Sequence, residues 1–517
     1  MSRRRGSGNP KDMPADKSFR RLWPAFGVFT VAAVVRLIYL VQSSDAPTFN
    51  IPIVDAGTYD LLARNLLSGE GFTDLFWQPP FYPLWLAAIY RLGGDMLAAK
   101  VIQALIGSLT CVMVFFLGEK FLGRRAGVLA GLLAGFYMPV VFLEAELLAT
   151  AWECFWFAAL AAFSFRIREK KSLSLSLLAG ACAALASLTR PNLIPVAIVW
   201  FLWLLWSWIK EKTGWKTAAL AACCAAGFAM ISLPAAFWSQ RIYGRFSILP
   251  HSGGLNLYIG NNPNWEKTLM IRPGTEWRRL TELPLADGIQ DKAGAEQWFY
   301  AKVRQYIAED PAGFIKRLAS KTTQFFLSRE VPRNVDIYHH RQWSDLLSLG
   351  VWRVGGFGFP FGVLLPLIVL GAWYWRRSLP AVLWLATGVY AASVIVVFVA
   401  GRFRAPIVPI LCIPASGGLL ALVKMVRLRE WGQAAVAVCV MAVIGVATSI
   451  AGPLPQERTD YASEMYFELG NSLRNRNRLA EAEGAYARAV EMRLDYADAH
   501  AALAALLKDR GAADEAV

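Results

Sequence analysis

Long apolar runs recur along the chain, and they constrain its fold more than any other feature of the sequence. Several reach roughly 18 residues or more, the length that an α-helix needs to cross about 30 Å of hydrocarbon. A spanning β-barrel would show short segments of alternating hydrophobicity instead. Of the 517 residues, 56% are hydrophobic and only 18% are charged, against about 25% charged residues in an ordinary soluble domain. We therefore predict an all-α polytopic membrane protein.

Eleven apolar runs are long enough to be read as spans. They lie near residues 22–42, 96–117, 126–142, 147–165, 174–189, 193–209, 217–238, 352–375, 380–400, 406–423 and 433–452. All seven cysteines fall inside such runs, so neither a disulfide framework nor a cysteine metal cluster is predicted. The first run lacks a signal-peptide cleavage site and is long enough to span, which favours a retained anchor.

The distribution of lysine and arginine orients these spans. With a cytoplasmic N-terminus, each predicted inside loop carries two to four basic residues, and the N-terminal tail 1–21 carries seven. Because cytoplasmic loops are enriched in Lys and Arg, this orientation is favoured over its opposite. Eleven crossings then place the C-terminus outside. Topology thus explains much of the net charge of +15, which does not indicate a nucleic-acid partner.

Three outer regions are long enough to carry function: a first loop at about 43–95, a large loop at about 239–351, and a soluble tail at 453–517. The tail follows the membrane domain 22–452 and resembles about one and a half tetratricopeptide repeats, with small and aromatic residues at Gly470, Ala482, Tyr486 and Ala489. So few repeats are not expected to be stable alone. The tail would pack on the outer loops, pair with another chain or extend a longer array; a helical hairpin without a binding role is the alternative.

The first outer loop has the pattern of an interfacial helix. From Tyr59, apolar residues recur at helical spacing until Ser68 and Gly69 end the pattern. Such a short amphipathic helix is expected to lie in the plane of the interface. Asp55 comes just before it and would lie at the membrane boundary, either as a helix cap or as a functional acid. The later stretch "WQPPFYPLWLAAIY" reads as a second helix started by proline.

Arginines and acids gather at the same predicted outer face. Arg190, Arg402 and Arg404 lie in short outer turns, where the positive-inside rule predicts few arginines. Glu144 and Glu146 lie in another outer turn. The arginines could reach lipid headgroups, and the glutamates could mark a solvated turn. Alternatively, the arginines hold a phosphate by their planar forks of donors, while a carboxylate takes a proton from an acceptor.

The order of five motifs resembles the GT-C superfamily of membrane glycosyltransferases. The motifs are "D-x-x-x-Y" from Asp55, then "PPFYP", "LTRPN", "GGLNLYIGNNP" and "RFRAPIVP". Over about residues 20–425, the chain is most similar to the bacterial enzymes related to protein O-mannosyltransferases and to the lipid A aminoarabinose transferase. This resemblance implies a GT-C-type bundle and a sugar taken from a polyprenyl-phosphate carrier at the outer face.

Carried over by position, the resemblance assigns roles to individual residues. Asp55 matches the catalytic base, and Arg402 and Arg404 match basic residues near the donor phosphate, which Arg190 and Gln78 would also contact. Gln78 and Phe403 depart from the family pattern, which often has a basic residue and a tyrosine at these positions. Supporting or substrate-binding roles are expected for Tyr59, Tyr82, Glu144, Glu146, Asn256 and Tyr258.

The predicted function is that of an inverting glycosyltransferase in the bacterial inner membrane. Its partners would be a polyprenyl-phosphate-linked sugar, membrane lipids, and a protein, lipid or glycan acceptor, with a protein partner for the tail 453–517 left open. A divalent metal ion near Asp55 or the glutamates stays open as a cofactor, without a ligand set in the sequence. The alternatives are a transporter or flippase of lipid-linked glycans, which would show two related halves and charges at mid-span, and a scaffold that recruits partners through its tail.

Overall fold

The computed structural model describes residues 15–69, 77–452, 454–509 and 511. A helix forms at each of the eleven predicted spans. These helices are α1 (Ala15–Gln42), α4 (Met96–Leu122), α5 (Arg124–Gly135) with α6 (Met138–Ala145), α7 (Thr150–Lys170), α8 (Leu173–Thr189), α9 (Leu193–Lys210), α10 (Trp215–Tyr243), α18 (Phe361–Tyr374), α19 (Ala381–Val397), α21 (Val408–Arg427) and α22 (Trp431–Ala447).

Five helical segments in the described part of the chain are long and apolar enough to cross a membrane singly, and α5 with α6 would make a sixth. They are Leu22–Asp45, Met96–Leu122, Leu193–Lys210, Trp215–Tyr243 and Gly401–Arg427. The helices α8, α18, α19 and α22 are also apolar but are shorter. The predicted count of eleven spans therefore stays a prediction.

Two predicted spans differ from straight helices. Residues 126–142 are divided into α5 and α6, with a bend of 50° between them. Pro139 lies in the first turn of α6, where proline is tolerated because the first N–H groups of a helix have no partner within it. The prediction was also wrong at the start of 352–375, where β1 (Trp352–Val354) and β2 (Phe357–Phe359) form an antiparallel hairpin. Gly355 makes its turn with φ of +56°.

The regions predicted to lie outside the membrane form a helical layer at one end of this bundle. The first loop contributes α2 (Val54–Ser68) and α3 (Phe81–Arg91). The large loop contributes α11 (Gly253–Asn261), α12 (Trp265–Met270), α13 (Thr275–Thr281), α14 (Lys292–Glu309), α15 (Pro311–Phe325), α16 (Ile337–His340) and α17 (Asp345–Gly350). A further short helix, α20 (Gly401–Arg404), precedes α21.

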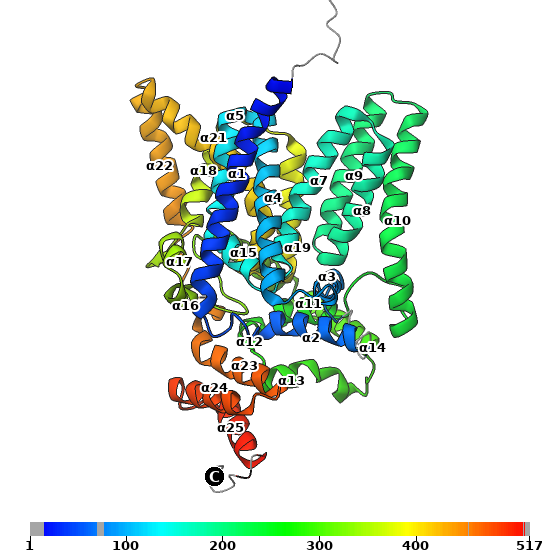
Figure 1. Ribbon diagram of the computed structural model, residues 1–517, viewed down its shortest axis with the longest axis vertical. Coiled ribbons are helices and arrows are strands. Elements are labelled where there is room, and N and C mark those ends of the chain that lie inside the picture. The colour runs from blue at the N-terminus through cyan, green and yellow to red at the C-terminus, as the bar shows by residue number, and fades with distance from the viewer. Residues whose placement is uncertain (1–14, 70–76, 453, 510, 512–517) are drawn as a thin grey trace, which may run out of the picture.

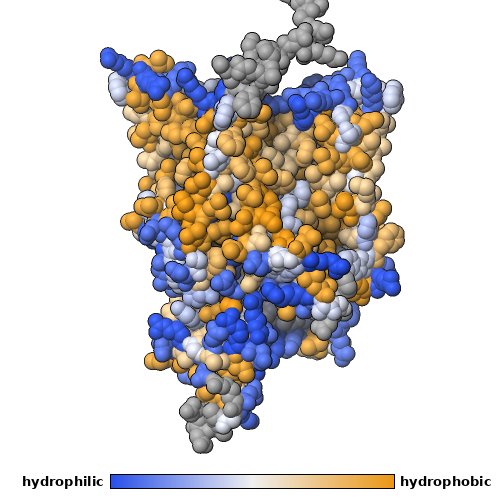
Figure 2. All heavy atoms as spheres, viewed as in Figure 1, coloured by the Kyte–Doolittle hydropathy of each residue, from blue (hydrophilic) through white to orange (hydrophobic). Residues whose placement is uncertain are grey.

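The tail adds the last three helices, α23 (Tyr461–Asn475), α24 (Leu479–Met492) and α25 (Ala497–Asp509). In Figure 1 they lie below α2 and α12, with α23 and α24 at about the level of α13, at the opposite end of the bundle from the start of α1. Figure 2 shows an apolar band between two hydrophilic ends on this face. The predicted odd number of crossings would place the two chain ends in this way.

The tail packs against the outer loops of its own chain. Phe467 and Leu473 of α23 are buried in one core cluster with Ile51 and Ile53 of the first loop. Within the tail, α23 and α24 approach closely because residue 470 is glycine; a Cβ there would lie 2.5 Å from the ring of Tyr486. Of the three arrangements predicted for the tail, the structure thus shows packing on the outer loops.

Candidate active site

A cavity of about 590 Å³ lies where the helical layer of the loops meets the adjacent ends of the bundle helices. Its walls include residues of the helices α2, α7, α11, α19 and α20 and of the segment that precedes α3. The large loop and the tail also contribute residues. The polar and charged residues that line it are Asp55, Thr58, Tyr59, Gln78, Glu153, Thr189, Arg190, Asn192, Ser252, Asn256, Arg272, Tyr300, Arg333, Asn334, Ser393, Arg402 and Glu468. The cavity therefore joins residues from nearly the whole length of the sequence.

Asp55 and Arg402 meet inside this cavity. Oδ2 of Asp55 lies 2.6 Å from Nη2 of Arg402, with 24% and 19% of the two side chains exposed. Asp55 stands in the first turn of α2, and Arg402 stands in α20. Burial alone would raise the pKa of Asp55, but Arg402, with Asn334 and Arg333, holds this pKa below its usual value. Asp55 is thus a carboxylate at neutral pH.

Arg402 keeps donor groups available beyond this ion pair. Its Nε and Nη1 atoms are buried and have no hydrogen-bond partner within the chain. Buried donors normally have partners, so these two atoms favour an anionic ligand in the cavity. A planar guanidinium can present two parallel N–H groups to a phosphate.

A second ion pair lies on the same wall. Nη1 of Arg190 is 2.6 Å from Oε1 of Glu153, whose side chain is only 3% exposed. The guanidinium groups of Arg190 and Arg402 both lie over the ring of Phe403, at 4.4 and 4.7 Å from its centroid. Phe403 thus holds two cations near each other by cation–π contacts, in the place where relatives often have tyrosine.

The large loop adds two arginines that the sequence analysis did not identify. Arg333 donates from Nη1 to the carbonyl oxygen of Leu269 at 2.9 Å. Burial and the nearby charge of Arg272 lower the pKa of Arg333 to about 10. Arg272 itself is paired with Glu464 of the tail at 2.7 Å. A bound anion would reduce the repulsion between positive charges that lie this close together.

The structure places six of the predicted residues in the cavity wall and five elsewhere. Those in the wall are Asp55, Tyr59, Gln78, Arg190, Asn256 and Arg402. Tyr82 is fully buried beneath them, donates to Gln103 and packs edge-on against Tyr59 at 4.9 Å. Tyr258 packs against Phe299 at 5.3 Å instead.

The two glutamates of the predicted outer turn also lie away from the cavity wall. Glu144 forms a buried ion pair with Arg36 of α1 at 2.6 Å. The backbone carbonyl of Glu146 accepts from the amide of Gln103 at 2.8 Å. The two residues thus do not contact the cavity, and their contacts hold α6 against α1 and α4.

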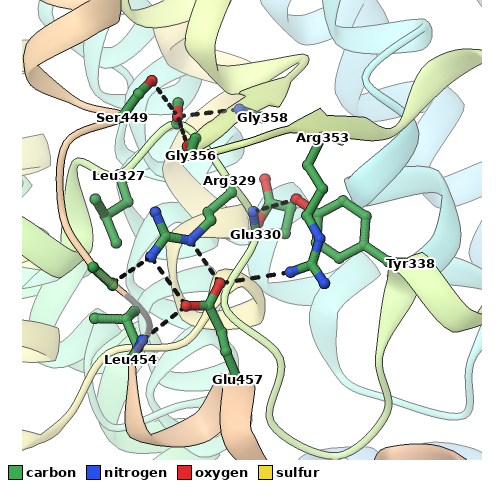
Figure 3. Close-up of polar contacts among 12 residues, drawn as sticks. Leu327, Arg329, Glu330, Tyr338, Arg353, Gly356, Gly358, Ser449, Leu454 and Glu457 are labelled. Carbon is green, nitrogen blue, oxygen red and sulfur yellow. Dashed lines mark hydrogen bonds and ion pairs between the residues drawn. The ribbon is translucent and has the colours of Figure 1, made fainter.

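Arg404 is buried next to the cavity rather than in it. It pairs with Glu330 at 2.8 Å, donates to the carbonyl oxygen of Leu327 at 2.7 Å and lies over the ring of Phe361. Figure 3 shows Glu330, whose backbone N–H donates to the hydroxyl of Tyr338 at 2.9 Å, near a network in which Arg329 and Arg353 contact Glu457. Arg404 thus anchors the large loop, and its predicted contact with a donor phosphate does not fit this position.

Within the described ranges, no group of three or more His, Cys, Asp or Glu side chains gathers to hold a metal ion. The carboxylates of the cavity are Asp55, Glu153 and Glu468, and the first two face arginines. The structure therefore adds no ligand set for the divalent ion that the sequence left open.

Residues 77–231 match the family model described as dolichyl-phosphate-mannose-protein mannosyltransferase. The match begins at the segment that carries Gln78 and ends within α10. It confirms the predicted resemblance over this part of the chain, and the helical structure confirms the predicted all-α fold class. No curated protein matches the chain by sequence.

Two of the solved structures that match the chain have low sequence identity to it. The archaeal oligosaccharyltransferase AglB from Archaeoglobus fulgidus, in complex with an inhibitory peptide and a dolichol-phosphate, is 16% identical with a TM-score of 0.46, and the match covers 90% of this chain and 59% of that one. ArnT from Cupriavidus metallidurans, bound to undecaprenyl phosphate, is 13% identical with a TM-score of 0.35, covering 80% and 79%. The chain thus spans about three fifths of the length of the archaeal enzyme.

Proposed function

We propose that the protein is an inverting glycosyltransferase that moves a sugar from a polyprenyl-phosphate donor to an acceptor at the extracytoplasmic face of a bacterial inner membrane. One observation carries the proposal: an ionised carboxylate, Asp55, and a cluster of arginines face the same cavity at the end of an apolar bundle. The match of residues 77–231 to a family described by a lipid-phosphate sugar donor supports this reading.

The charges of the cavity suit a direct displacement. Asp55 takes the proton of an acceptor hydroxyl or amine as its oxygen or nitrogen forms a bond to the anomeric carbon. The bond between that carbon and the phosphate oxygen breaks, and its electron pair leaves with the polyprenyl phosphate. Arg402 and Arg190, with Arg333 behind them, stabilise the negative charge that develops on this leaving group. Attack opposite the leaving group inverts the anomeric carbon.

This assignment changes the predicted phosphate contacts. We assign Arg333 in place of Arg404 to the donor phosphate, because Arg404 forms a buried ion pair with Glu330. Gln78 lines the cavity and can donate from its amide, although relatives often have a cation there. The sugar and the acceptor, whether protein, lipid or glycan, are set by the remaining polar wall, to which Tyr59 and Asn256 contribute.

An alternative role as a transporter or scaffold does not require a base in this cavity, so one experiment separates the classes. The purified protein is given a polyprenyl-phosphate sugar and an acceptor extract free of membranes, and release of polyprenyl phosphate is measured. Asp55→Asn is expected to lower turnover about 10²–10⁴-fold with its melting temperature retained. Asp45→Asn, an exposed acid of the same loop, is the matched control. Equal turnover in Asp55→Asn and the wild type would remove the base assignment.

A further inference from the structure

The backbone immediately before Asp55 adopts an unfavourable conformation. Val54 has φ of +51°, in the left-handed region that a β-branched residue rarely occupies. Such a conformation persists only where the surrounding structure holds it, and residues of this kind cluster at functional sites. Because Val54 is the neighbour of Asp55, its conformation sets the direction in which the Asp55 carboxylate enters the cavity.

The C-terminal tail packs against the segment that precedes Val54 and forms a hydrogen bond with it. Ile51 and Ile53 are 6% and 5% exposed, buried against the tail helices. Between them, the carbonyl oxygen of Pro52 accepts from Oγ of Ser472 at 2.9 Å. From the other side, the backbone of α2 at Gly57 lies close to the same carbonyl oxygen, because a Cβ added to Gly57 would be only 2.8 Å from it. Residues 51–53 are thus fixed between α23 and α2.

A second contact from the tail fixes α2 itself. Nη2 of Arg476 lies 2.7 Å from Oδ2 of Asp60, whose side chain is 3% exposed. The other oxygen of Asp60 accepts from the hydroxyl of Tyr90 in α3 at 2.7 Å. Arg476 therefore ties the tail to both helices of the first loop, little more than one helical turn beyond Asp55.

The tail is in turn attached to the large loop that supplies the cationic wall. Glu464 pairs with Arg272 at 2.7 Å, and Arg272 also donates to the carbonyl oxygen of Asn334 at 3.1 Å. Asp498 accepts from the hydroxyl of Thr275 at the start of α13 at 2.6 Å. The tail thus bridges the loop that carries Asp55 and the loop that carries Arg333.

We propose that the C-terminal tail is a positioning module for the candidate base, in which Ser472 and Arg476 hold the 51–54 segment and α2 so that Asp55 faces Arg402. The inference rests on the proposed function and deepens it. It assigns Ser472 and Arg476 as positioning residues, because they act through Asp55 and do not line the cavity. It also explains why a short set of repeats is ordered: its packing partner is the first loop of its own chain.

The test uses the full-length protein in nanodiscs, with hydrogen exchange of residues 50–58 and turnover of a polyprenyl-phosphate sugar as separate readouts. In the double variant Ser472→Ala with Arg476→Ala, exchange at 50–58 is expected to accelerate. The kcat is expected to fall by roughly tenfold, with the KM for the donor within about twofold. Arg478→Ala is the matched control, since Arg478 pairs with Glu481 inside the tail and is expected to change neither readout.

Restoring the conformation of Val54 separates positioning from general stability. Glycine adopts positive φ readily, so adding Val54→Gly to the double variant is expected to recover a large part of the lost kcat, whereas Val54→Ala is not. If the double variant does not fold, Arg476→Lys, which keeps the charge but loses the fork, replaces it with a smaller expected loss.

Three results would overturn the inference: unchanged exchange at 50–58, faster exchange with unchanged kcat, or a loss of kcat that Val54→Gly leaves as it was. Failure of the proposed function is distinguishable, because it would appear as absent turnover in the wild type. In that case the exchange data still decide whether the tail holds the segment.

Discussion

Two arginines separated by one residue have different surroundings in this protein. Arg402 faces the cavity and Asp55, whereas Arg404 is 3% exposed and paired with Glu330. Both belong to α20, where positions i and i+2 point to different sides of the helix. The pair therefore allows binding and stability to be tested separately at neighbouring positions.

Arg402→Ala is expected to weaken binding of undecaprenyl phosphate by about tenfold or more with little effect on the melting temperature, because the side chain is partly exposed. Arg404→Ala is expected to destabilise the protein by ~3 kcal/mol or more, because it leaves Glu330 buried without its cation. Calorimetric titration with undecaprenyl phosphate and thermal melting measure the two effects. A reversal of this pattern would contradict the assignment of both residues.

Glu468 makes the tail sensitive to pH. Burial, with the neighbouring charge of Glu464, raises the pKa of Glu468 to about 7. Between its usual pKa and this value, the folded protein binds a proton that the unfolded chain has lost, so stability falls as pH rises through this range. Glu468→Gln is expected to be near neutral at about pH 5 and stabilising by ~1–3 kcal/mol at about pH 8.

Thermal melting at both pH values measures this difference. Glu491→Gln is the control, because Glu491 is 63% exposed and pairs with Arg488 on the surface of the tail. Equal effects of Glu468→Gln at the two pH values would show that Glu468 stays ionised in the folded protein.

At the residue scale, the sequence predicted what topology alone determines. Asp55, Arg190 and Arg402 could be placed at one face from the order of the apolar runs, and the structure brings all three to one cavity. Arg404 could have been separated from Arg402 by the geometry of a single helical turn. Arg333 and Glu468 could not be found, since their positions depend on how the large loop and the tail fold over α2.

At the element scale, close helix packing depends on glycine. Gly180 of α8 and Gly227 of α10 bring the two backbones so near that a Cβ at either position would overlap a carbonyl of the other helix. Small residues at such crossings are typical of membrane helices, whose association relies on van der Waals packing and interhelical hydrogen bonds. At Gly388 of α19, by contrast, an added Cβ would meet no neighbouring atom within 4 Å.

Gly180→Leu is therefore expected to lower the melting temperature in detergent and to separate α10 from α8, at a cost of about 1–3 kcal/mol for an overpacked contact. Gly388→Leu carries the same change at an exposed position of α19 and is expected to have little effect. Equal loss in the two variants would indicate that intrinsic helix propensity, rather than the crossing of α8 and α10, is responsible.

The elements themselves were largely predictable, and the exceptions have local causes. Each long apolar run became a helix because the hydrocarbon length and the helical period agree. Residues 352–359 directly precede an apolar run, yet Gly355 and Gly356 turn the chain into a hairpin, with Trp352 stacked on Phe359 at 5.1 Å. Apolar composition cannot distinguish such a hairpin from the end of a helix.

At the scale of the whole molecule, the proposed sidedness can be measured directly. Leu494→Cys in the tail, where the native side chain is 80% exposed, is expected to react with a membrane-impermeant maleimide in intact cells with a permeable outer membrane. Lys212→Cys, in a predicted cytoplasmic loop, is expected to react only after the inner membrane is opened. Labelling of Lys212→Cys alone in intact cells would invert the topology and place the cavity in the cytoplasm.

The ion pair between Asp55 and Arg402 has a consequence for kinetics. While Arg402 neutralises the carboxylate, that carboxylate is a poor proton acceptor; a phosphate that recruits the guanidinium sets it free. In the proposed reaction, a nucleophile that arrived first would meet a carboxylate still paired with Arg402, so we expect the two substrates to bind in a compulsory order, the lipid-linked donor first. When the acceptor is scarce, the freed carboxylate would face the bound donor alone, so the donor would be spared hydrolysis only where the cavity keeps water from the anomeric carbon.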